Sequence, residues 1–418
     1  MTMDADNATR PGPYATRGTP DDGHVAFFND PKVRSTLFQT LLIVGLVAFV
    51  LFIVTNTAQN LNNQSKDFGW SWLDEPAGFG INQTLVPYSE TSAYAQVFLV
   101  GLTNTLLVAI LGIFIATIVG FVVGIARLSN NWVVAKLAYG FVEIFRNVPL
   151  LLWLFIFYFG IVNANLPSYR DVFARLAEGG AQGGDSVFAL LSKKGLALPK
   201  PIFLDGSMSI LIAFVVGIVA AYILGRWAKA RQMSTGQTFP SFWTGLGLII
   251  GLPLLTYFVL GRPIEFELPT LSRFNLRGGM NLIPEMIALL LALALYTAAY
   301  IAEIVRAGIL AVSKGQSEAS SALGLQRGQA LRLVIIPQAL RVIVPPLTNQ
   351  FLNLTKNSSL AVAIAYPELV SVFFGTALNQ VGREVEIVLI TMGTYLVLSL
   401  LTSTFMNWYN SRISLVER

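Results

Sequence analysis

The sequence of 418 residues has no cysteine, one histidine, and only 12% charged residues. Without cysteine there is no disulfide, no thiolate nucleophile and no cysteine-ligated metal cluster. The one histidine, His24, lies in a polar N-terminal stretch, and we interpret it as an incidental surface residue. Ordinary globular domains have about twice this charged fraction. Typical soluble enzymes, disordered proteins, collagen-like fibres and disulfide-rich secreted domains are therefore excluded.

The residues that are present are those of a membrane protein: 54% are hydrophobic, 11% are aromatic, and the mean hydropathy is +0.63. We predict an all-α, polytopic fold, since lipid requires every backbone polar group to be bonded within the spanning segment. Residues 1–35 lack a signal-peptide pattern and predict a disordered tail. Hydropathy then predicts eight transmembrane helices. They are 36–58, 96–125, 142–162, 209–225, 242–260, 283–304, 342–369 (interrupted) and 385–408.

The distribution of basic residues orients these spans. Loops on the N-terminal side carry 16 Lys and Arg against 7 acidic residues, whereas the opposite loops carry 10 against 11. By the positive-inside rule the first set is cytoplasmic, and an even number of spans places both termini there. The net charge of +5 thus reflects loops facing the cytoplasm, and we expect no nucleic-acid partner. No G-x-x-x-x-G-K-[ST] motif is present, so this chain does not bind ATP by that device.

Several spans contain polar residues, which are costly in hydrocarbon unless they face protein or water. In the seventh span, Lys356 and its neighbours, together with Pro345–Pro346, predict a broken helix that lines a pathway. The candidate pathway residues are Asn104, Tyr300, Asn349, Asn353, Lys356, Asn357, Ser358 and Ser359. Three charges, Glu143, Arg146 and Glu303, fall near predicted cytoplasmic ends. For these, a structural ion pair or snorkelling stays open beside a gating role.

The long loop between the sixth and seventh spans is organised. Gly315 and Ser317 suit a helix start, residues 319–323 are small or apolar, and Gly324 suits a helix end. This pattern predicts a short cytoplasmic helix that another subunit approaches closely. A helix lying on the membrane surface would look much the same.

The same loop resembles the EAA loop of ABC-importer permeases. Glu318-Ala319-Ser320, Gly324, Val334 and Ile336-Pro337 stand at the spacing of that motif, with mild departures at Ser320, Val334 and Ile336. The blocks "GLTNTLLVAILGI", "VEIFRNVPLLLWLFIFYFG", "LYTAAYIAEIVRAGI" and "PQALRVIVPPLTNQFLNLTKNSSLA" are similar to polar-amino-acid permeases of type I importers. The extra first span and the insert resemble the larger permease of general L-amino-acid and glutamate/glutamine/aspartate/asparagine importers.

The resemblance implies a core of five transmembrane helices with three extra ones. It divides the chain into a tail (1–35), an extra helix and periplasmic loop (36–95), two core parts (96–162 and 283–418) and an insert with two helices (163–282). The coupling loop is 313–337. It further implies an inner-membrane, non-enzymatic subunit that moves amino acids. Its coupling residues are Gln316, Glu318, Ala319, Ser320, Leu323 and Gly324.

Partners follow from the resemblance as well. They are a second permease, a homodimer of ATP-binding subunits that carries ATP and Mg, a periplasmic amino-acid-binding protein, the lipid bilayer and the amino-acid substrate. No cofactor or metal is expected in this chain. Glu318 either pairs with a basic residue of the ATPase or caps its own helix, and the cap is slightly favoured because acidic residues stabilise a first helical turn.

Two other functions remain as alternatives. An ion-coupled secondary amino-acid transporter would also show broken helices and buried charges, but it commonly contains internal repeats, and none is visible here. A receptor or structural membrane protein would not need polar groups in five spans.

Overall fold

The computed structural model describes residues 31–64, 66, 68–178, 186–271 and 276–413. The chain divides into two units, the first of which ends at Gly69. The predicted tail and His24 lie mostly outside the described residues. In the first unit, helix α1 spans Pro31–Asn63, so residues 31–35 are helical rather than part of a tail. Its apolar side chains are exposed all round, with Leu42 74% exposed, as in a helix surrounded by lipid.

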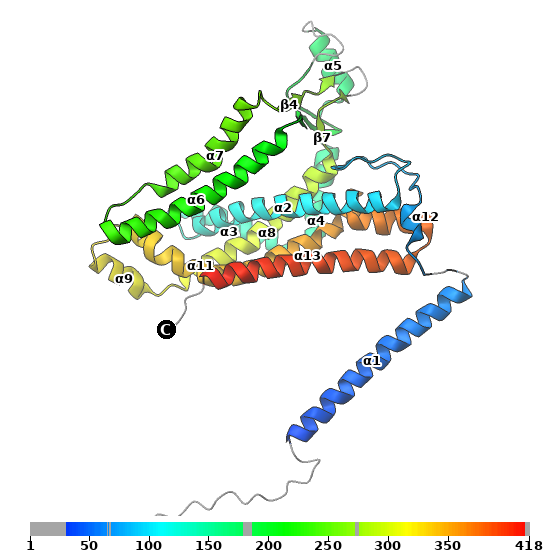
Figure 1. Cartoon of the computed structure of the whole chain (residues 1–418), viewed down its shortest axis with the longest axis horizontal. Helices are drawn as coiled ribbons and strands as arrows, with labels where there is room; N and C mark the ends of the chain where they lie inside the picture. Colours follow the sequence, from blue (N-terminus) through cyan, green and yellow to red (C-terminus); the bar gives the residue numbers. More distant parts are fainter. Residues whose placement is uncertain (1–30, 65, 67, 179–185, 272–275, 414–418) are drawn as a thin grey trace, which may run out of the picture. The chain divides into compact units, whose positions relative to one another are not determined.

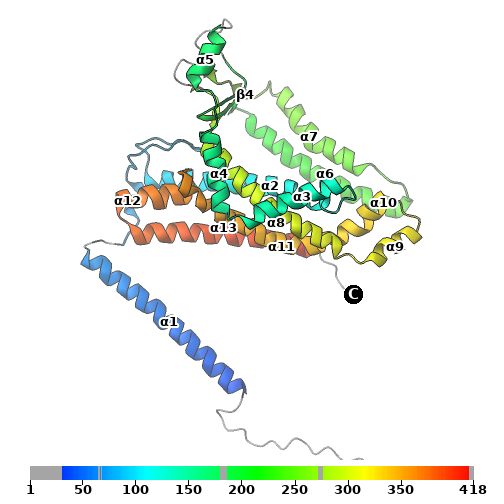
Figure 2. The same cartoon turned by 180° about the vertical axis from the view of Figure 1, so that it is seen from behind.

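The second unit is a bundle of long helices with a small strand-containing region at one end (Figures 1 and 2). Within the described residues of the chain, seven helices are long and apolar enough to cross a membrane, and the pair α3–α4 makes an eighth. The predicted helical membrane fold is thus confirmed. The bundle helices are α2 (Tyr94–Ala126), α3 (Trp132–Asn147), α4 (Leu150–Val162), α6 (Ser207–Thr235), α7 (Ser241–Val259), α8 (Pro284–Leu310), α11 (Ile336–Asn357) and α13 (Glu384–Ile413).

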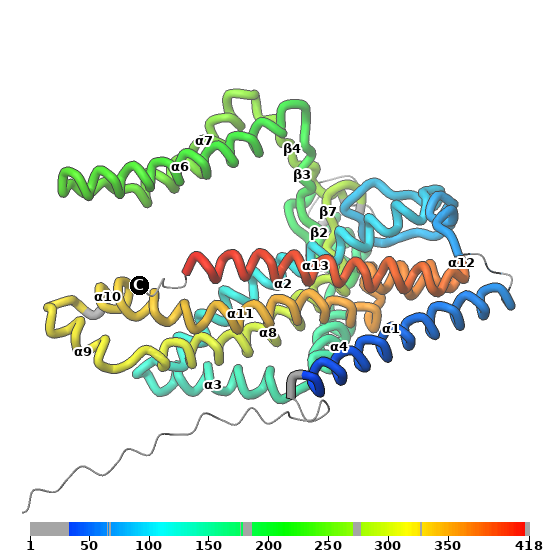
Figure 3. The backbone as a smooth tube through the Cα atoms, turned by 60° about the horizontal axis from the view of Figure 1, so that its bottom comes forward, coloured from blue at the N-terminus to red at the C-terminus, as the bar shows by residue number. Residues whose placement is uncertain are grey.

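Helix α8 forms the centre of the bundle. Helices α2, α3, α4 and α11 pack against it (Figure 3). The main apolar core includes buried residues along most of its length. Its buried positions are mostly small or aliphatic residues such as Ala292 and Ala298, both 0% exposed. Small side chains let neighbouring backbones approach closely, which is how helices associate in lipid.

Two glycines of α2 allow a close approach of this kind. A Cβ at Gly120 would lie 2.6 Å from Ile301, and one at Gly124 would lie 2.7 Å from the carbonyl oxygen of Ala302. The Gly120-x-x-x-Gly124 pattern is therefore a packing face against α8. The similar Gly247-x-x-x-Gly251 pattern is not, since nothing lies within 4 Å of a Cβ at either position.

The third span is bent rather than straight. Helix α3 ends at Asn147, α4 begins at Leu150, and the two axes differ by 105°. The residues between them, Val148 and Pro149, adopt extended backbone, and a residue before proline is disfavoured from the helical region. Residues 132–141, expected in a cytoplasmic loop, are thus helical.

The seventh span breaks at a different place from the one predicted. Pro345 and Pro346 lie within the continuous helix α11, and the break follows Asn357. A 3₁₀ segment, Ser358–Ile364, and the left-handed Ala365 (φ 56°) come next. The chain then re-enters a helical stretch, η4 (Val370–Ala377) with α12 (Leu378–Val381), in a region expected to be a loop.

The insert between α4 and α8 adds short strands that the all-α prediction missed. Helix α5 (Tyr169–Glu178) precedes β1 (Leu190–Ser192), β2 (Gly195–Leu198) and β3 (Lys200–Phe203), and the strands after α7 are β4 (Ile264–Glu267), β5 (Thr270–Leu271), β6 (Leu276–Arg277) and β7 (Met280–Leu282). All pairs are antiparallel, in the orders β1-β2-β7, β3-β4 and β5-β6. The pairing of Leu196 with Leu282 and of Lys200 with Glu267 joins the two ends of the α6–α7 hairpin.

Candidate functional site

The loop after α8 contains a short exposed helix, α9 (Lys314–Ala322), followed by α10 (Arg327–Ala330) and the π-helical turn η2 (Leu331–Ile335). Helix α9 contacts α10 and η2, and α10 lies beside it in Figure 2. Gln338 of α11 donates a hydrogen bond to the Gln316 side chain (3.1 Å). The helix is therefore held by its own loop and by the start of α11, while most of its surface stays free.

The end of α9 presents a large apolar side chain. Leu323 is 80% exposed and ends the helix, and Gly324 follows in the left-handed conformation with φ 73°. Nothing lies within 4 Å of a Cβ at Gly324. The helix end predicted there is confirmed, and glycine is required by backbone conformation rather than by crowding.

The coupling residues divide into a buried and an exposed face. Ser320 is 3% exposed and its hydroxyl bonds the carbonyl of Gln316, whereas Glu318 and Ala319 are exposed. Glu318 is the fifth residue of α9, beyond its first turn, and among the described side chains none bonds it. The favoured capping role of Glu318 is therefore wrong: the helix begins earlier than the sequence suggested.

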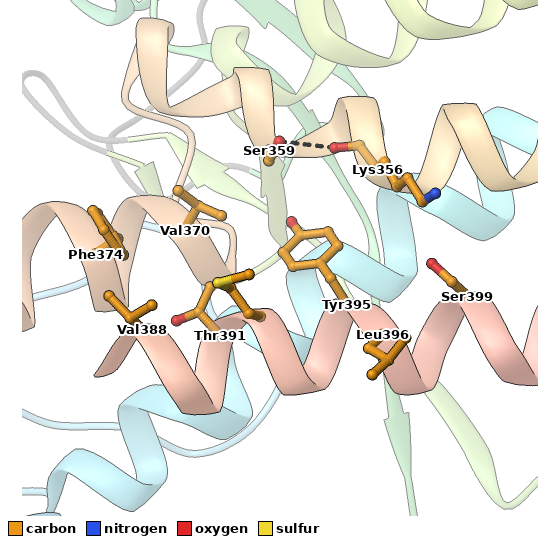
Figure 4. A pocket seen from close by; sticks show the side chains of 10 residues that line it. Lys356, Ser359, Val370, Phe374, Val388, Thr391, Tyr395, Leu396 and Ser399 are labelled. Atoms are coloured by element: carbon orange, nitrogen blue, oxygen red, sulfur yellow. Dashed lines mark hydrogen bonds between the residues drawn. The ribbon is translucent and has the colours of Figure 1, made fainter. Parts of the chain in front are cut away.

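A cavity of about 580 Å³ lies between the α11–η4 region and α13. Lys356, Ser359, Thr391, Tyr395 and Ser399 give it polar groups, and the rest of its lining is apolar. Figure 4 shows Tyr395 projecting from α13 toward the helix that carries Lys356 and Ser359. Lys356 is the one charged side chain among the described residues that line it.

Part of the predicted pathway lies together on one face. Asn349, Asn353 and Lys356 are exposed and follow one another at helical spacing on α11, and Ser359 continues past its end. This polar face of α11 ends at the cavity. None of the described residues of this chain covers this polar face, and Asn349, Asn353 and Lys356 stay exposed.

Other predicted pathway residues lie elsewhere. Asn104 is 0% exposed, and its amide donates to the carbonyls of Gln83 (2.9 Å) and Pro367 (2.8 Å). Ser358 is also 0% exposed and bonds the Thr355 carbonyl, and Asn357 lies beside Leu150 of α4. None of these three lines the cavity. Asn104 and Ser358 instead satisfy buried backbone carbonyls, which need donors.

Sequence reasoning missed Glu368 and Tyr395. The Glu368 carboxylate is 0% exposed and accepts bonds from the backbone N–H of Val370 (2.8 Å) and Ser371 (2.7 Å) and from the Tyr395 hydroxyl (2.9 Å). It caps η4 and ties that segment to α13. A glutamate directly before the apolar run that begins at Leu369 was the signal available in the sequence.

The charges predicted as structural or gating residues come together in part. Glu303 of α8 pairs with Arg127, which follows α2, with Arg306 (2.6 Å) and with Arg146 at the end of α3 (3.9 Å). The Arg146 guanidinium also lies over the Tyr300 ring, 5.1 Å from its centre. Glu143 instead accepts a bond from Asn147 of its own helix (3.0 Å). Tyr300 therefore belongs to this arginine cluster and not to the cavity.

No group of three or more His, Asp or Glu side chains suited to a metal ion occurs within the residues that the structure describes. The chemistry available at these sites is that of binding and movement: one lysine, several hydroxyls and amides, and a buried carboxylate that is already bonded.

Comparison with known proteins gives matches over nearly the whole chain. The family profile described as "Binding-protein-dependent transport system inner membrane component" matches residues 213–415. The general L-amino acid transport system permease protein AapQ of Rhizobium johnstonii is 51% identical, covering 93% of this chain and 94% of that protein. The glutamate/glutamine/aspartate/asparagine transport system permease protein BztB of Rhodobacter capsulatus is 41% identical, covering 93% and 96%.

A second permease protein of that Rhodobacter capsulatus system, BztC, is 33% identical over 41% of this chain and 38% of its own length.

Proposed function

We infer the role of this chain from its family: it belongs to the binding-protein-dependent transport system inner membrane components, as a permease subunit of an ABC amino-acid importer. It is a multi-pass inner-membrane protein and not an enzyme, since ATP is hydrolysed by a separate subunit. Membership of this family argues against the ion-coupled transporter considered as an alternative. We propose that the substrates are L-amino acids, with glutamate, glutamine, aspartate and asparagine among them.

The assembly we propose has a second permease, a dimer of ATP-binding subunits and a periplasmic amino-acid-binding protein. One system in Rhodobacter capsulatus has two permease proteins, BztB and BztC, and both resemble this chain. The uncovered polar face of α11 supports a second permease, because polar groups in a membrane need protein or water beside them. ATP and Mg belong to the ATP-binding subunits, and this chain needs no cofactor of its own.

We propose that α9 is the element through which the ATP-binding subunits move this chain. We also propose that α9 and both termini lie on the cytoplasmic side. The observation that carries the proposal is the exposed end of α9, where Leu323 is 80% exposed and small residues surround it. Shifting a pore with two conformations from a 1:99 to a 99:1 population ratio takes about 5.5 kcal/mol. The ATP-binding subunits must therefore bind this chain in the two conformations with free energies that differ by about that amount. The hydrogen bond from Gln338 links α9 to α11, which carries the polar face.

The path we propose follows Asn349, Asn353, Lys356 and Ser359 into the cavity. A zwitterionic amino acid needs donors for its carboxylate and acceptors for its ammonium group, and Lys356 with the hydroxyls of Tyr395 and Ser399 supplies both kinds. Arg146 and Glu303 keep a proposed structural or gating role at the end of α8 near α9, and Glu143 lies outside that cluster. Tyr300, predicted on the pathway, lies beside Arg146 instead.

Gly324→Val tests the coupling helix. Valine is strained at φ 73°, at a cost of about 1–2 kcal/mol, so the helix end must rearrange. We expect uptake of labelled amino acid by cells carrying the whole system to fall to background, with normal amounts of the chain in the membrane. The matched control is Gly328→Val in α10, where the added side chain also meets open space. Normal uptake by Gly324→Val would contradict the coupling role.

Lys356→Ala tests the path. Loss of a charged hydrogen-bond partner for the substrate carboxylate should lower uptake about tenfold. Lys193→Ala, at an exposed lysine in the insert, is the control. Equal uptake by the two variants would remove the reason for placing the path along α11.

A further inference from the structure

A second pocket, of about 390 Å³, lies where α2 and α8 end and α3 begins. Arg127, Lys136 and Arg306 line it together with the rings of Trp132 and Tyr139. Among the described residues that line it there is no carboxylate. It is separate from the cavity beside Lys356, and no step of the proposed transport cycle uses it.

The charges around this pocket do not cancel. One carboxylate, Glu303, is shared by Arg127, Arg146 and Arg306, which leaves two positive charges in that cluster. Lys136 adds a third, and no ion pair of the described residues includes it. Arg127 and Arg306 are partly buried, whereas Lys136 is exposed. Partly buried positive charge that is not fully paired favours an anion beside it.

The arginines that line the pocket keep unused hydrogen-bond donors. An arginine has five N–H donors, and the bonds recorded for the described residues use one from Arg127 and two from Arg306. Arg127 and Lys136 both lie over the Tyr139 ring, 5.4 and 5.5 Å from its centre, and both line the pocket. Guanidinium and ammonium groups arranged in this way suit a phosphate.

The position of the pocket indicates where that phosphate comes from. Arg127 follows the last residue of α2, and Arg306 lies one turn before the end of α8, which leads into α9. The pocket is thus at the level of lipid headgroups, and Trp132 beside it is 73% exposed, as aromatic residues are at a membrane interface. Helix α3 also exposes Val133 (54%) and Leu137 (71%), an apolar surface suited to acyl chains.

We propose that this pocket binds the phosphate of an anionic phospholipid, held by Arg127, Lys136 and Arg306, with its glycerol region against Trp132 and Tyr139. Basic pockets between transmembrane helices bind such headgroups. The bound lipid would offset one of the positive charges left uncompensated by the shared Glu303 and join the ends of α2, α3 and α8.

Native mass spectrometry of the full-length chain with its partner subunits tests the proposal, after exchange into an equimolar mixture of phosphatidylglycerol and phosphatidylcholine. We expect retained phosphatidylglycerol to exceed phosphatidylcholine, and Lys136→Gln to lower that preference about fivefold. Lys136→Arg should restore it. Lys229→Gln is the control, since Lys229 is an exposed lysine on α6 outside the pocket. Lys136 is itself exposed, so neither substitution disturbs the core.

Three results would overturn the proposal. The first is an equal lipid preference in Lys136→Gln and Lys229→Gln. The second is complete displacement of the lipid by millimolar inorganic phosphate, which would make this a site for a soluble anion. The third is a lipid preference that Lys136→Gln lowers in the chain alone but leaves unchanged in the assembly with its partner subunits, which would mean that a partner protein covers the pocket. Uptake is not the readout, so failure here leaves the proposed transport role intact.

Discussion

Helices α8 and α6 are both apolar and nearly equal in length, with 27 and 29 residues. The most apolar 18-residue window of α8 has the lower hydropathy, 2.0 against 2.5, yet 56% of that window is buried in the protein against 6% for α6. Burial therefore runs opposite to hydropathy here. Lipid is as apolar as leucine, so a helix gains nothing by exchanging lipid for protein unless its surface packs better there.

Surface shape and polarity explain the difference. Helix α8 has alanines where α2, α4 and α11 approach, and it contains Glu303, which has three arginine partners. Helix α6 has large exposed residues such as Leu211 and Tyr222 and packs mainly against α7. The loss of stability caused by a mutation should therefore depend on how tightly the mutated position is packed and not on the change in hydropathy.

The largest effect is expected for Gly120→Leu. Its Cβ alone would lie 2.6 Å from Ile301 and 3.0 Å from the Ala298 carbonyl oxygen, so α2 and α8 must separate. Overpacking of this kind costs about 1–3 kcal/mol, and more where backbone obstructs. The fraction of chain that stays monodisperse in detergent after heating should fall sharply. Gly247→Leu on α7 meets open space and should match the wild type; equal losses would break the comparison.

A smaller effect is expected for Asn104→Ala. The change leaves the buried carbonyls of Gln83 and Pro367 without a donor, at a cost of about 1–3 kcal/mol. A lowered midpoint of thermal unfolding in detergent would register it. Thr103→Ala is the control on the same helix, since the Thr103 hydroxyl bonds only the carbonyls of Leu99 and Val100 one turn earlier. No difference between the two would mean that this buried amide contributes nothing to the fold.

The smallest effect is expected in the insert, at Asp171→Asn. The Ser168 hydroxyl and backbone N–H both bond the Asp171 carboxylate and hold its pKa below the ordinary value, with nearby Arg175 and Lys193 acting in the same direction. A lowered pKa means that the ionised form stabilises the start of α5, and that this contribution is lost as pH falls through the lowered value.

At neutral pH the variant should exchange the amide hydrogens of the first turn of α5 faster than the wild type, with the membrane helices unchanged. Asp205→Asn, at another exposed aspartate of the insert, is the control. Equal exchange rates in α5 would show that the carboxylate is not needed there.

The positions of the membrane spans could be predicted from the sequence, whereas the positions of the breaks within them could not. Runs of about 20 apolar residues are long-range signals, and each of the eight predicted spans has a helix or a bent pair in the structure. The break in the seventh span depends on tertiary contacts. Proline was the obvious local signal, but α11 continues through Pro345–Pro346 and stops at Asn357, where Ser358 and Ala361 are buried.

The candidate site shows the same division. The spacing around Gly324 predicted the end of α9 because a helix end is local chemistry. The partners of a polar residue are not local. Asn104 and Lys356 look alike as polar residues within apolar spans, yet the first bonds backbone in the interior and the second faces a cavity. Residue type predicts that a polar group needs a partner, and only the fold decides which one.

Tyr395 connects the cavity to the buried carboxylate of Glu368. Its ring forms one wall of the cavity, and its hydroxyl is one of the three donors to the enclosed carboxylate of Glu368. On the proposed path, a substrate that displaced this ring would leave the buried Glu368 carboxylate with two donors instead of three. This coupling favours passage by movement of whole helices, with the Tyr395 side chain kept in place.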